Sequence, residues 1–316
     1  VDTDDGMIKA LSVLLELASQ NGKLDTVQLL LDDGKANSSW PLRLASENGH
    51  SDVVEVLLND ARVDPRHSNS SALVAACAKG RTNVVRLLLE DQRSDPLVFS
   101  SFCLRWASSM GAFELVKTLL DDQRSDPNAC NSYALTLASA NGYTRIVKLL
   151  LENQRSDPSA MQSRPLCFAA SNGHTKVVRL LLADARSNNH DAECNALNLA
   201  CANGHEETAL FLLENARADP CARSAQRLVF ACARGHVKIL QLLLRDGRSD
   251  PARFGSSCLR MASENGHAEV VRLLLRDGRA DPAASGNFAL QRASTIRHDG
   301  IIKLLVEDGR SGPASS

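Results

Sequence analysis

Apolar residues recur along the chain in blocks of fixed period. With a glycine taken as position zero, apolar side chains occupy mainly −8, −7, −5 and −4, and a second apolar run such as Val270–Leu275 follows. Because residues three and four apart share one face of an α-helix, each block predicts two helices joined by a turn. The first spacing is 27 residues and all later ones are 31, at Gly22, Gly49, Gly80, Gly111, Gly142, Gly173, Gly204, Gly235, Gly266 and Arg297. Such a period predicts a solenoid of ten repeats.

Three positions hold the same residue in every repeat. Leucine stands at −7 and +8 and alanine at −4, as in Leu135, Leu150 and Ala138. Helices approach closely only where side chains are small, so the alanine predicts that the first helices of successive repeats stack. The leucines are predicted to fill the space between the two helix layers, where each buried side chain stabilises by about 1.5–3 kcal/mol. Each repeat gains this stabilisation only against its neighbours.

Residues at the helix ends predict how each unit begins and ends. Glycine at zero tolerates the positive φ of a tight helix-ending turn. Asp-Pro pairs, such as Asp250-Pro251, follow the second helix, and proline ends a helix because it lacks a donor. Serines at −10 are predicted to be N-caps of the first helix: Ser39, Ser70, Ser101, Ser132, Ser163 and Ser256.

One repeat displays the whole pattern. The segment Arg164-Pro-Leu-Cys-Phe-Ala-Ala-Ser-Asn-Gly-His174, followed by Val177-Val-Arg-Leu-Leu-Leu182, resembles the ankyrin repeat. The resemblance extends over roughly residues 7–312 and implies an all-α helix-turn-helix solenoid, with residues 1–316 forming a single array. The family usually repeats every 33 residues or so. The missing residues fall in the connection where the family forms a β-hairpin finger, so we expect shortened inter-repeat loops with little strand.

Composition and charge narrow the function. The chain carries 36 basic and 37 acidic residues, for a net charge of −1, which argues against nucleic acid as the partner. It has no run of 18 apolar residues, so we expect no membrane span. Val1 is not followed by a basic and then apolar leader, so no secretory signal is predicted. The nine cysteines contain no Cys-x-x-Cys pair. We interpret them as reduced core thiols of a cytoplasmic or nuclear protein.

Histidines follow the glycine position in six repeats and raise the question of metal binding or pH sensing: His50, His174, His205, His236, His267 and His298. Neighbours in a helical stack lie about 10 Å apart, too far to share a zinc ion. In the resembled family this histidine braces the turn through a hydrogen bond, and we adopt that interpretation. The chain has no phosphate-binding glycine loop and no hydrolase or metalloprotease motif. We therefore expect no enzyme activity, no cofactor and no metal.

Arginine recurs at +13 in nine repeats: Arg62, Arg93, Arg124, Arg155, Arg186, Arg217, Arg248, Arg279 and Arg310. A stripe of arginines could follow a polyanion backbone. However, aspartate stands two residues later in seven repeats: Asp64, Asp95, Asp126, Asp157, Asp219, Asp250 and Asp281. The alternation favours a structural ladder of Arg–Asp pairs between neighbouring loops.

The residues at positions −9 and −6 vary along the array. In the resembled family the first helix lines a concave face that binds protein partners, so we expect a non-enzymatic interaction scaffold. Aromatic residues and arginine are enriched at binding hot spots, and the predicted partner-binding residues are Trp40, Arg43, Phe102, Arg105, Tyr133 and Arg164. The alternative for Phe102 and Tyr133 is that they cover the edge of the next repeat's core.

Self-assembly is a second functional class that the sequence leaves open. Residues 1–158 have a net charge of −5 and residues 159–316 a net charge of +4, and the last helix, Ile301–Val306, keeps the apolar pattern of inner repeats. Head-to-tail contacts that do not close would build a filament. The competing explanation is that the chain belongs to a longer array whose next repeat caps it.

Overall fold

The computed structural model describes residues 2–36, 40–187, 190–215, 224–247 and 250–310. These residues form twenty α-helices and one 3₁₀ turn, Ala185–Ser187, and contain no strand. The expected all-α fold with short connections and little strand is confirmed. Within the same ranges, no helix has the length and apolar character needed to cross a membrane.

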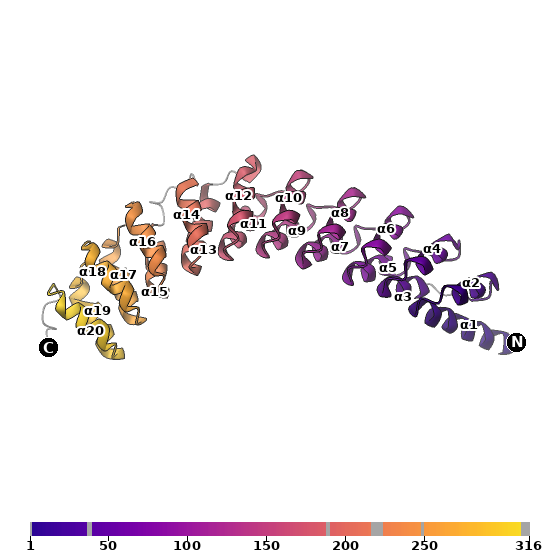
Figure 1. The fold of residues 1–316 in the computed structure, drawn as a ribbon, viewed down its shortest axis with the longest axis horizontal. Coiled ribbons are helices and arrows are strands. Elements are labelled where there is room, and N and C mark those ends of the chain that lie inside the picture. The colour runs from indigo at the N-terminus through magenta and orange to yellow at the C-terminus, as the bar shows by residue number, and fades with distance from the viewer. Residues whose placement is uncertain (1, 37–39, 188–189, 216–223, 248–249, 311–316) are drawn as a thin grey trace. The chain divides into compact units, whose positions relative to one another are not determined.

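The chain divides into two compact units, residues 1–157 and 158–316. Each unit consists of helix-turn-helix repeats, whose two members are called here the first and the second helix (Figure 1). The continuity of these units as one array over residues 1–316 stays a prediction.

In residues 1–157 the first helices are α1 (Asp2–Gln20), α3 (Trp40–Asn48), α5 (His67–Ala78), α7 (Val98–Met110) and α9 (Ala129–Ala140). The second helices are α2 (Leu24–Asp32), α4 (Ser51–Asn59), α6 (Thr82–Glu90), α8 (Phe113–Asp121) and α10 (Thr144–Glu152). Figure 1 shows the two sets as separate layers within this unit.

In residues 158–316 the first helices are α11 (Ala160–Ser171), α13 (His190–Asn203), α15 (Ser224–Arg234), α17 (Arg253–Glu264) and α19 (Ala284–Ile296). The second helices are α12 (Thr175–Ala183), α14 (Glu206–Asn215), α16 (Val237–Asp246), α18 (Ala268–Asp277) and α20 (Asp299–Glu307).

The invariant positions form the core. Leu135, Leu150 and Ala138 are completely buried, as are their equivalents in the other inner repeats. Successive first helices contact each other more extensively than successive second helices. Close stacking of the first layer is as expected where alanine stands at −4, and the leucines are buried.

A histidine of one repeat closes the turn of the repeat before it. Nε2 of His205 lies 2.8 Å from the carbonyl oxygen of Ser171, to which it donates. The ring also covers Gly173, whose φ is +75°, and a Cβ built there would stand 2.5 Å from Nδ1 of His205. Glycine is therefore required both by the backbone and by the ring. His50, His236, His267 and His298 make the same contact. The predicted bracing role is confirmed at these five positions.

The serines at −10 are not N-caps, and this prediction is wrong. Ser101 has a φ of +55° and closes a left-handed turn that begins at Phe99. Its Oγ accepts the backbone N–H of Asp126, in the next repeat, at 2.9 Å. Ser70, Ser132 and Ser256 do the same with the residue 25 positions later, whereas Ser39 lies outside the described residues. At these four positions the serine connects repeats instead of beginning a helix, and Ser163 has the same left-handed φ, of +57°, without that bond among the described residues.

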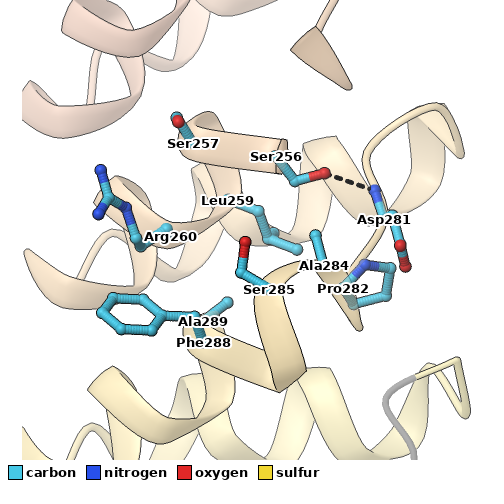
Figure 2. A pocket seen from close by; sticks show the side chains of 10 residues that line it. All are labelled: Ser256, Ser257, Leu259, Arg260, Asp281, Pro282, Ala284, Ser285, Phe288 and Ala289. Atoms are coloured by element: carbon cyan, nitrogen blue, oxygen red, sulfur yellow. Dashed lines mark hydrogen bonds between the residues drawn. The ribbon is translucent and has the colours of Figure 1, made fainter. Parts of the chain in front are cut away.

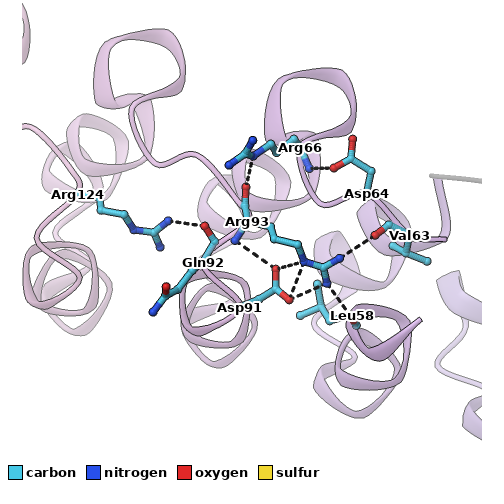
Figure 3. A network of polar contacts seen from close by, with 8 residues as sticks. All are labelled: Leu58, Val63, Asp64, Arg66, Asp91, Gln92, Arg93 and Arg124. Carbon is cyan, nitrogen blue, oxygen red and sulfur yellow. Dashed lines mark hydrogen bonds and ion pairs between the residues drawn. The ribbon is translucent and has the colours of Figure 1, made fainter. Parts of the chain in front are cut away.

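The arginines at +13 form a ladder, but with a partner other than the predicted one. Nε and Nη2 of Arg93 donate to the carboxylate of Asp91, two residues earlier, at 2.8 and 2.7 Å (Figure 3). The same guanidinium donates to the carbonyl oxygens of Leu58, at 2.7 Å, and Val63, at 3.2 Å, in the preceding repeat. Leu58 lies in the last turn of α4, where carbonyl groups lack intrahelical donors. The arginine thus caps its neighbour's helix while its own aspartate holds it in place.

The same arrangement recurs in both units. Arg124 donates to Asp122 and to the carbonyls of Leu89 and Ser94. Arg310 donates to Asp308 and to the carbonyl of Leu275. Arg217 and Arg248 lie outside the described residues. Because these guanidinium groups are occupied by protein acceptors, the ladder does not present the free cationic stripe that a polyanion would need.

Ion pairing shifts the titration of the ladder's acids. The hydrogen bond from Arg62 lowers the pKa of Asp60, and burial opposes that effect only in part. Hydrogen bonds from arginine likewise lower the pKa of Asp184, Asp277 and Asp308. The aspartates at +15 have another role, since Oδ1 of Asp64 accepts the backbone N–H of Arg66, an Asx turn that shapes the loop (Figure 3).

Candidate functional site

One side of the first helices, called here the first-helix face, is the partly exposed side in each unit. Its residues stand at −9, −6, −5 and −2 of each repeat, which is the spacing of one side of an α-helix, and of these Thr136 and Asn198 at −6 are buried. In α5 these positions hold Ser71, Val74, Ala75 and Ala78. They are all small, so the face is lowered along α5.

The neighbouring helices raise large side chains on both sides of this lowered strip. Trp40 and Arg43 stand on α3, and Phe99 and Phe102 stand on α7. Together with Val74 on α5 they line a cavity of about 440 Å³, called here the aromatic groove. Trp40 is 45% exposed and Phe99 is 61% exposed. The groove therefore offers aromatic surface that the fold itself does not bury.

Ring contacts hold the walls of the aromatic groove in place. The guanidinium of Arg43 lies 5.2 Å from the centre of the Trp40 ring, and His67 meets that ring edge-on at 6.2 Å. On the opposite wall Phe102 stacks on Trp106 with ring centres 5.8 Å apart. These stacked pairs restrict the rotamers of the walls, which lowers the ordering cost of binding.

Only three of the six predicted binding residues line the aromatic groove. Trp40, Arg43 and Phe102 come together in the aromatic groove, whereas Arg105 and Tyr133 do not line it. The guanidinium of Arg105 donates to the carbonyl oxygens of Phe99, at 2.7 Å, and Ser100, at 3.0 Å. Arg105 therefore stabilises the left-handed turn that presents Phe99.

The remaining two predicted binding residues are Tyr133 and Arg164. Tyr133 is half-buried on α9. Arg164 belongs to the second unit, where its guanidinium lies 5.1 Å from the ring centre of Phe168 and donates to the sulfur of Met161. That both also bind a partner stays a prediction.

A smaller pocket of about 260 Å³ lies on the second unit, between α17 and α19. Oγ of Ser256 accepts the backbone N–H of Asp281 at 2.8 Å on one side of this pocket, and Arg260 and Phe288 lie on the other side (Figure 2). The guanidinium of Arg260 lies 5.5 Å from the ring centre of Phe288. Arginine on an aromatic ring thus recurs on the first-helix face of both units.

Comparison with known proteins identifies the architecture. Residues 14–100, 104–191, 154–224 and 228–313 match the family described as ankyrin repeats in three copies. The chain belongs to the ankyrin repeat family. The ankyrin repeat domain of human ASB11 is similar in fold, with 24% identity, a TM-score of 0.55, and coverage of 67% of this chain and 99% of that domain. No curated protein matches the sequence.

Ankyrin repeats generally mediate protein–protein interaction. Two cysteines of the second unit have raised pKa values. Burial raises the pKa of Cys167 to about 11. It raises the pKa of Cys201 to about 12, against the opposing charge of Arg227. Both thiols are therefore protonated at neutral pH and are poor nucleophiles. No group of three or more metal-ligating side chains was found in the part of the chain that the structure describes.

Sequence reasoning missed two parts of this ankyrin face. The first is position −5, which follows −9 by four residues on the same helix face and carries the exposed rings of Trp106, Phe168 and Phe230. Helical spacing alone could have found it. The second is Phe99, at −12, which reaches the groove only because the left-handed turn carries it there. No local pattern signals that turn.

A buried polar contact in the second unit was also missed. Arg227 is completely buried at −8, where other repeats have Ala, Cys, Leu or Pro. Its Nε donates to Oδ1 of Asn198 at 2.5 Å. The exception in an otherwise small or apolar column was visible in the sequence.

Proposed function

We propose that this ankyrin array is a non-enzymatic scaffold that binds a protein partner on its first-helix face, centred on Trp40, Arg43 and Phe102. The observation that carries the proposal is the aromatic groove, in which two helices raise aromatic walls around a floor of small side chains. Trp and Arg are the residue types that dominate binding energy at protein interfaces.

The absence of a converging set of catalytic groups in the described ranges agrees with a binding role. The ladder arginines, such as Arg93, donate to main-chain carbonyls. The histidines that follow the turn glycine, such as His205, likewise bond a turn carbonyl through Nε2. The thiols with a described pKa shift are held protonated by burial. Binding through exposed rings is what the remaining side chains support, and the reduced core thiols suit an intracellular location.

Affinity capture from the native source tests the proposal. The bait is the full chain, compared with a Trp40→Ala/Phe102→Ala double variant and with a Leu29→Ala control. Leu29 is 71% exposed on α2 and lies outside the groove. We expect the captured partner to be lost only with the double variant. Equal capture by all three baits, each with an unchanged circular dichroism spectrum, would place the binding site elsewhere.

A self-assembling structural protein is the second candidate, favoured by one observation. Leu14 on α1 is 51% exposed, whereas Cys103 and Cys258, which occupy the equivalent position in α7 and α17, are buried by the preceding repeat. A second copy stacked on α1 would bury Leu14 in the same way. The halves of opposite net charge would favour such head-to-tail contact.

Light scattering across salt concentrations tests this candidate. Rods that lengthen at low salt and shorten as charges are screened would support it. A monomer at low salt and high protein concentration would contradict it.

A further inference from the structure

The walls and floor of the aromatic groove follow the direction of one helix. The floor residues Ser71, Val74, Ala75 and Ala78 run along α5. The walls stand on α3 and α7, on either side of α5, and the cavity has a volume of about 440 Å³. The floor side chains are short, so the axis of a partner helix can approach that of α5 to the roughly 8–10 Å at which helices pack. A partner helix can therefore lie along α5, with its side chains between the two walls.

The groove offers main chain only in two left-handed turns, Ser68–Ser70 and Phe99–Ser101. The rest of α3, α5 and α7 is helical and the described residues contain no strand, so an extended peptide would find no strand edge to extend. A helix satisfies its own backbone and needs only side-chain contacts. The geometry thus selects helix-in-groove recognition, with apolar anchors at i, i+4 and i+7.

The charged side chains that line the groove favour an acidic side chain on the partner. Arg43 stacks on Trp40 and makes no hydrogen bond or ion pair with any residue the structure describes. The other charged residues that line the groove, Glu47 and Lys79, form an ion pair at 3.7 Å and so offset each other. The groove is left with one uncompensated positive charge, whose guanidinium edge is available to a carboxylate.

Building on the proposed function, we propose that the aromatic groove binds an amphipathic helix of a partner protein that presents an apolar stripe and an acidic side chain to Arg43. The apolar stripe meets Trp40, Phe99 and Phe102. The acid pairs with Arg43 while that guanidinium remains stacked on the Trp40 ring, which fixes its orientation and strengthens the pair.

A displayed library of 16-residue helix-forming peptides, randomised on one face, tests the proposal on the full chain. We expect selected peptides to carry Leu, Phe or Met at i, i+4 and i+7 and Asp or Glu one turn away. A synthetic peptide made from the strongest sequence should bind at least about tenfold more weakly to Trp40→Ala and Phe102→Ala variants. It should bind the Leu29→Ala control as it binds the parent chain.

A charge swap isolates the role of Arg43. Arg43→Glu should weaken the peptide at least about tenfold, Arg43→Lys should weaken it less, and changing the peptide's acid to Lys should restore binding to Arg43→Glu. Peptides that depend on Trp40 and Phe102 but ignore Arg43→Glu would overturn this inference and leave the proposed function standing. Peptides that depend on none of the three residues would overturn both. Concentration-dependent self-association lost in Phe102→Ala would make a second copy the occupant and would also overturn the inference.

Discussion

Two buried serines on α7 differ in whether the hydroxyl group is hydrogen-bonded, and this difference predicts opposite effects on stability. Ser101 and Ser108 are both inaccessible to solvent. Oγ of Ser101 accepts the N–H of Asp126 at 2.9 Å, across the boundary between repeats. The hydroxyl of Ser108 has no hydrogen-bond partner in the described structure. Replacing either serine by alanine removes one hydroxyl oxygen from α7. Only Ser101→Ala also removes a hydrogen bond.

The magnitudes follow from the cost of an unmade hydrogen bond. A net hydrogen bond contributes about 0.5–1.5 kcal/mol, and a donor left without a partner in a buried place costs about 1–3 kcal/mol. Because Asp126 itself is exposed, we expect Ser101→Ala to destabilise by about 1–2 kcal/mol. Ser108→Ala removes a buried hydroxyl that has no partner and should change stability by about 0–1 kcal/mol in the stabilising direction.

Two measurements separate these expectations. Urea unfolding followed by circular dichroism gives the free energy of unfolding of the parent chain and both variants. Hydrogen exchange of the Asp126 amide gives a local measure, which should accelerate about tenfold in Ser101→Ala if the lost stabilisation is near 1.4 kcal/mol. Equal destabilisation by both substitutions, or an unchanged Asp126 amide in Ser101→Ala, would refute the inter-repeat role of the serine.

The remaining predictions concern packing, backbone and pH. Leu135→Ala should destabilise by about 2–5 kcal/mol through a cavity and Ala138→Leu by about 1–3 kcal/mol through overpacking, both by urea unfolding; neutral effects would contradict the stacking argument. Gln162→Gly should stabilise by about 0–1 kcal/mol, because relief of a left-handed φ of +61°, worth about 1–2 kcal/mol, exceeds the entropy cost of glycine, about 0.5–1 kcal/mol. Gly286→Ala should destabilise although a Cβ there meets no atom within 4 Å, and unchanged melting temperatures in both variants would contradict the argument. The lowered pKa of four ladder aspartates in the folded state means that their ionised form stabilises the fold. Their contribution to the free energy of unfolding should be complete above about pH 5 and lost as pH falls below about 4. An acid titration of stability measures this loss, which should be smaller in Asp→Asn variants. The aspartates concerned are Asp60, Asp184, Asp277 and Asp308.

The sequence predicted the features that recur at one position of every repeat. Leucine and alanine recur at the positions of Leu135 and Ala138 because they pack against the same neighbours, so their burial could be read from the period. The turn glycine, such as Gly173, follows from the same period, whereas the bracing role of His205 came from the resemblance to the ankyrin repeat. Helix order, turn position and layer assignment all follow from these columns.

Contacts between repeats were harder to predict because sequence separation hides them. Serine at −10 precedes a helix as an N-cap would, and nothing local shows that Ser101 bonds a residue 25 positions later. Arg93 has an aspartate two residues ahead, Asp95, and another two residues behind, Asp91. Both spacings look alike in the sequence. Only the carbonyls at the end of the preceding helix aim the guanidinium back toward Asp91.

The candidate site was predicted in part. Positions −9 and −6 identified Trp40, Arg43 and Phe102, which meet in the aromatic groove. They also identified Arg105, whose side chain supports the turn instead. A rule based on residue type cannot separate a free arginine from one bound to a carbonyl, because the carbonyl belongs to a left-handed turn that the sequence does not signal.

Recurrent inter-repeat contacts use other residues than those of the first-helix face, which explains why this face can differ from repeat to repeat. The contacts of His205, Arg93 and Ser101 run from a side chain of one repeat to main-chain groups of its neighbour. Main-chain groups are present whatever side chain a neighbour carries, so contacts of this kind do not depend on residues at −9 and −6. The bond from Arg227 to Asn198, at −6, is an exception in the second unit. Substitutions such as Trp40→Ala should then leave the stack intact. A face freed from holding the fold together is available for recognition, and there the chain places its exposed aromatic residues and its uncompensated arginine.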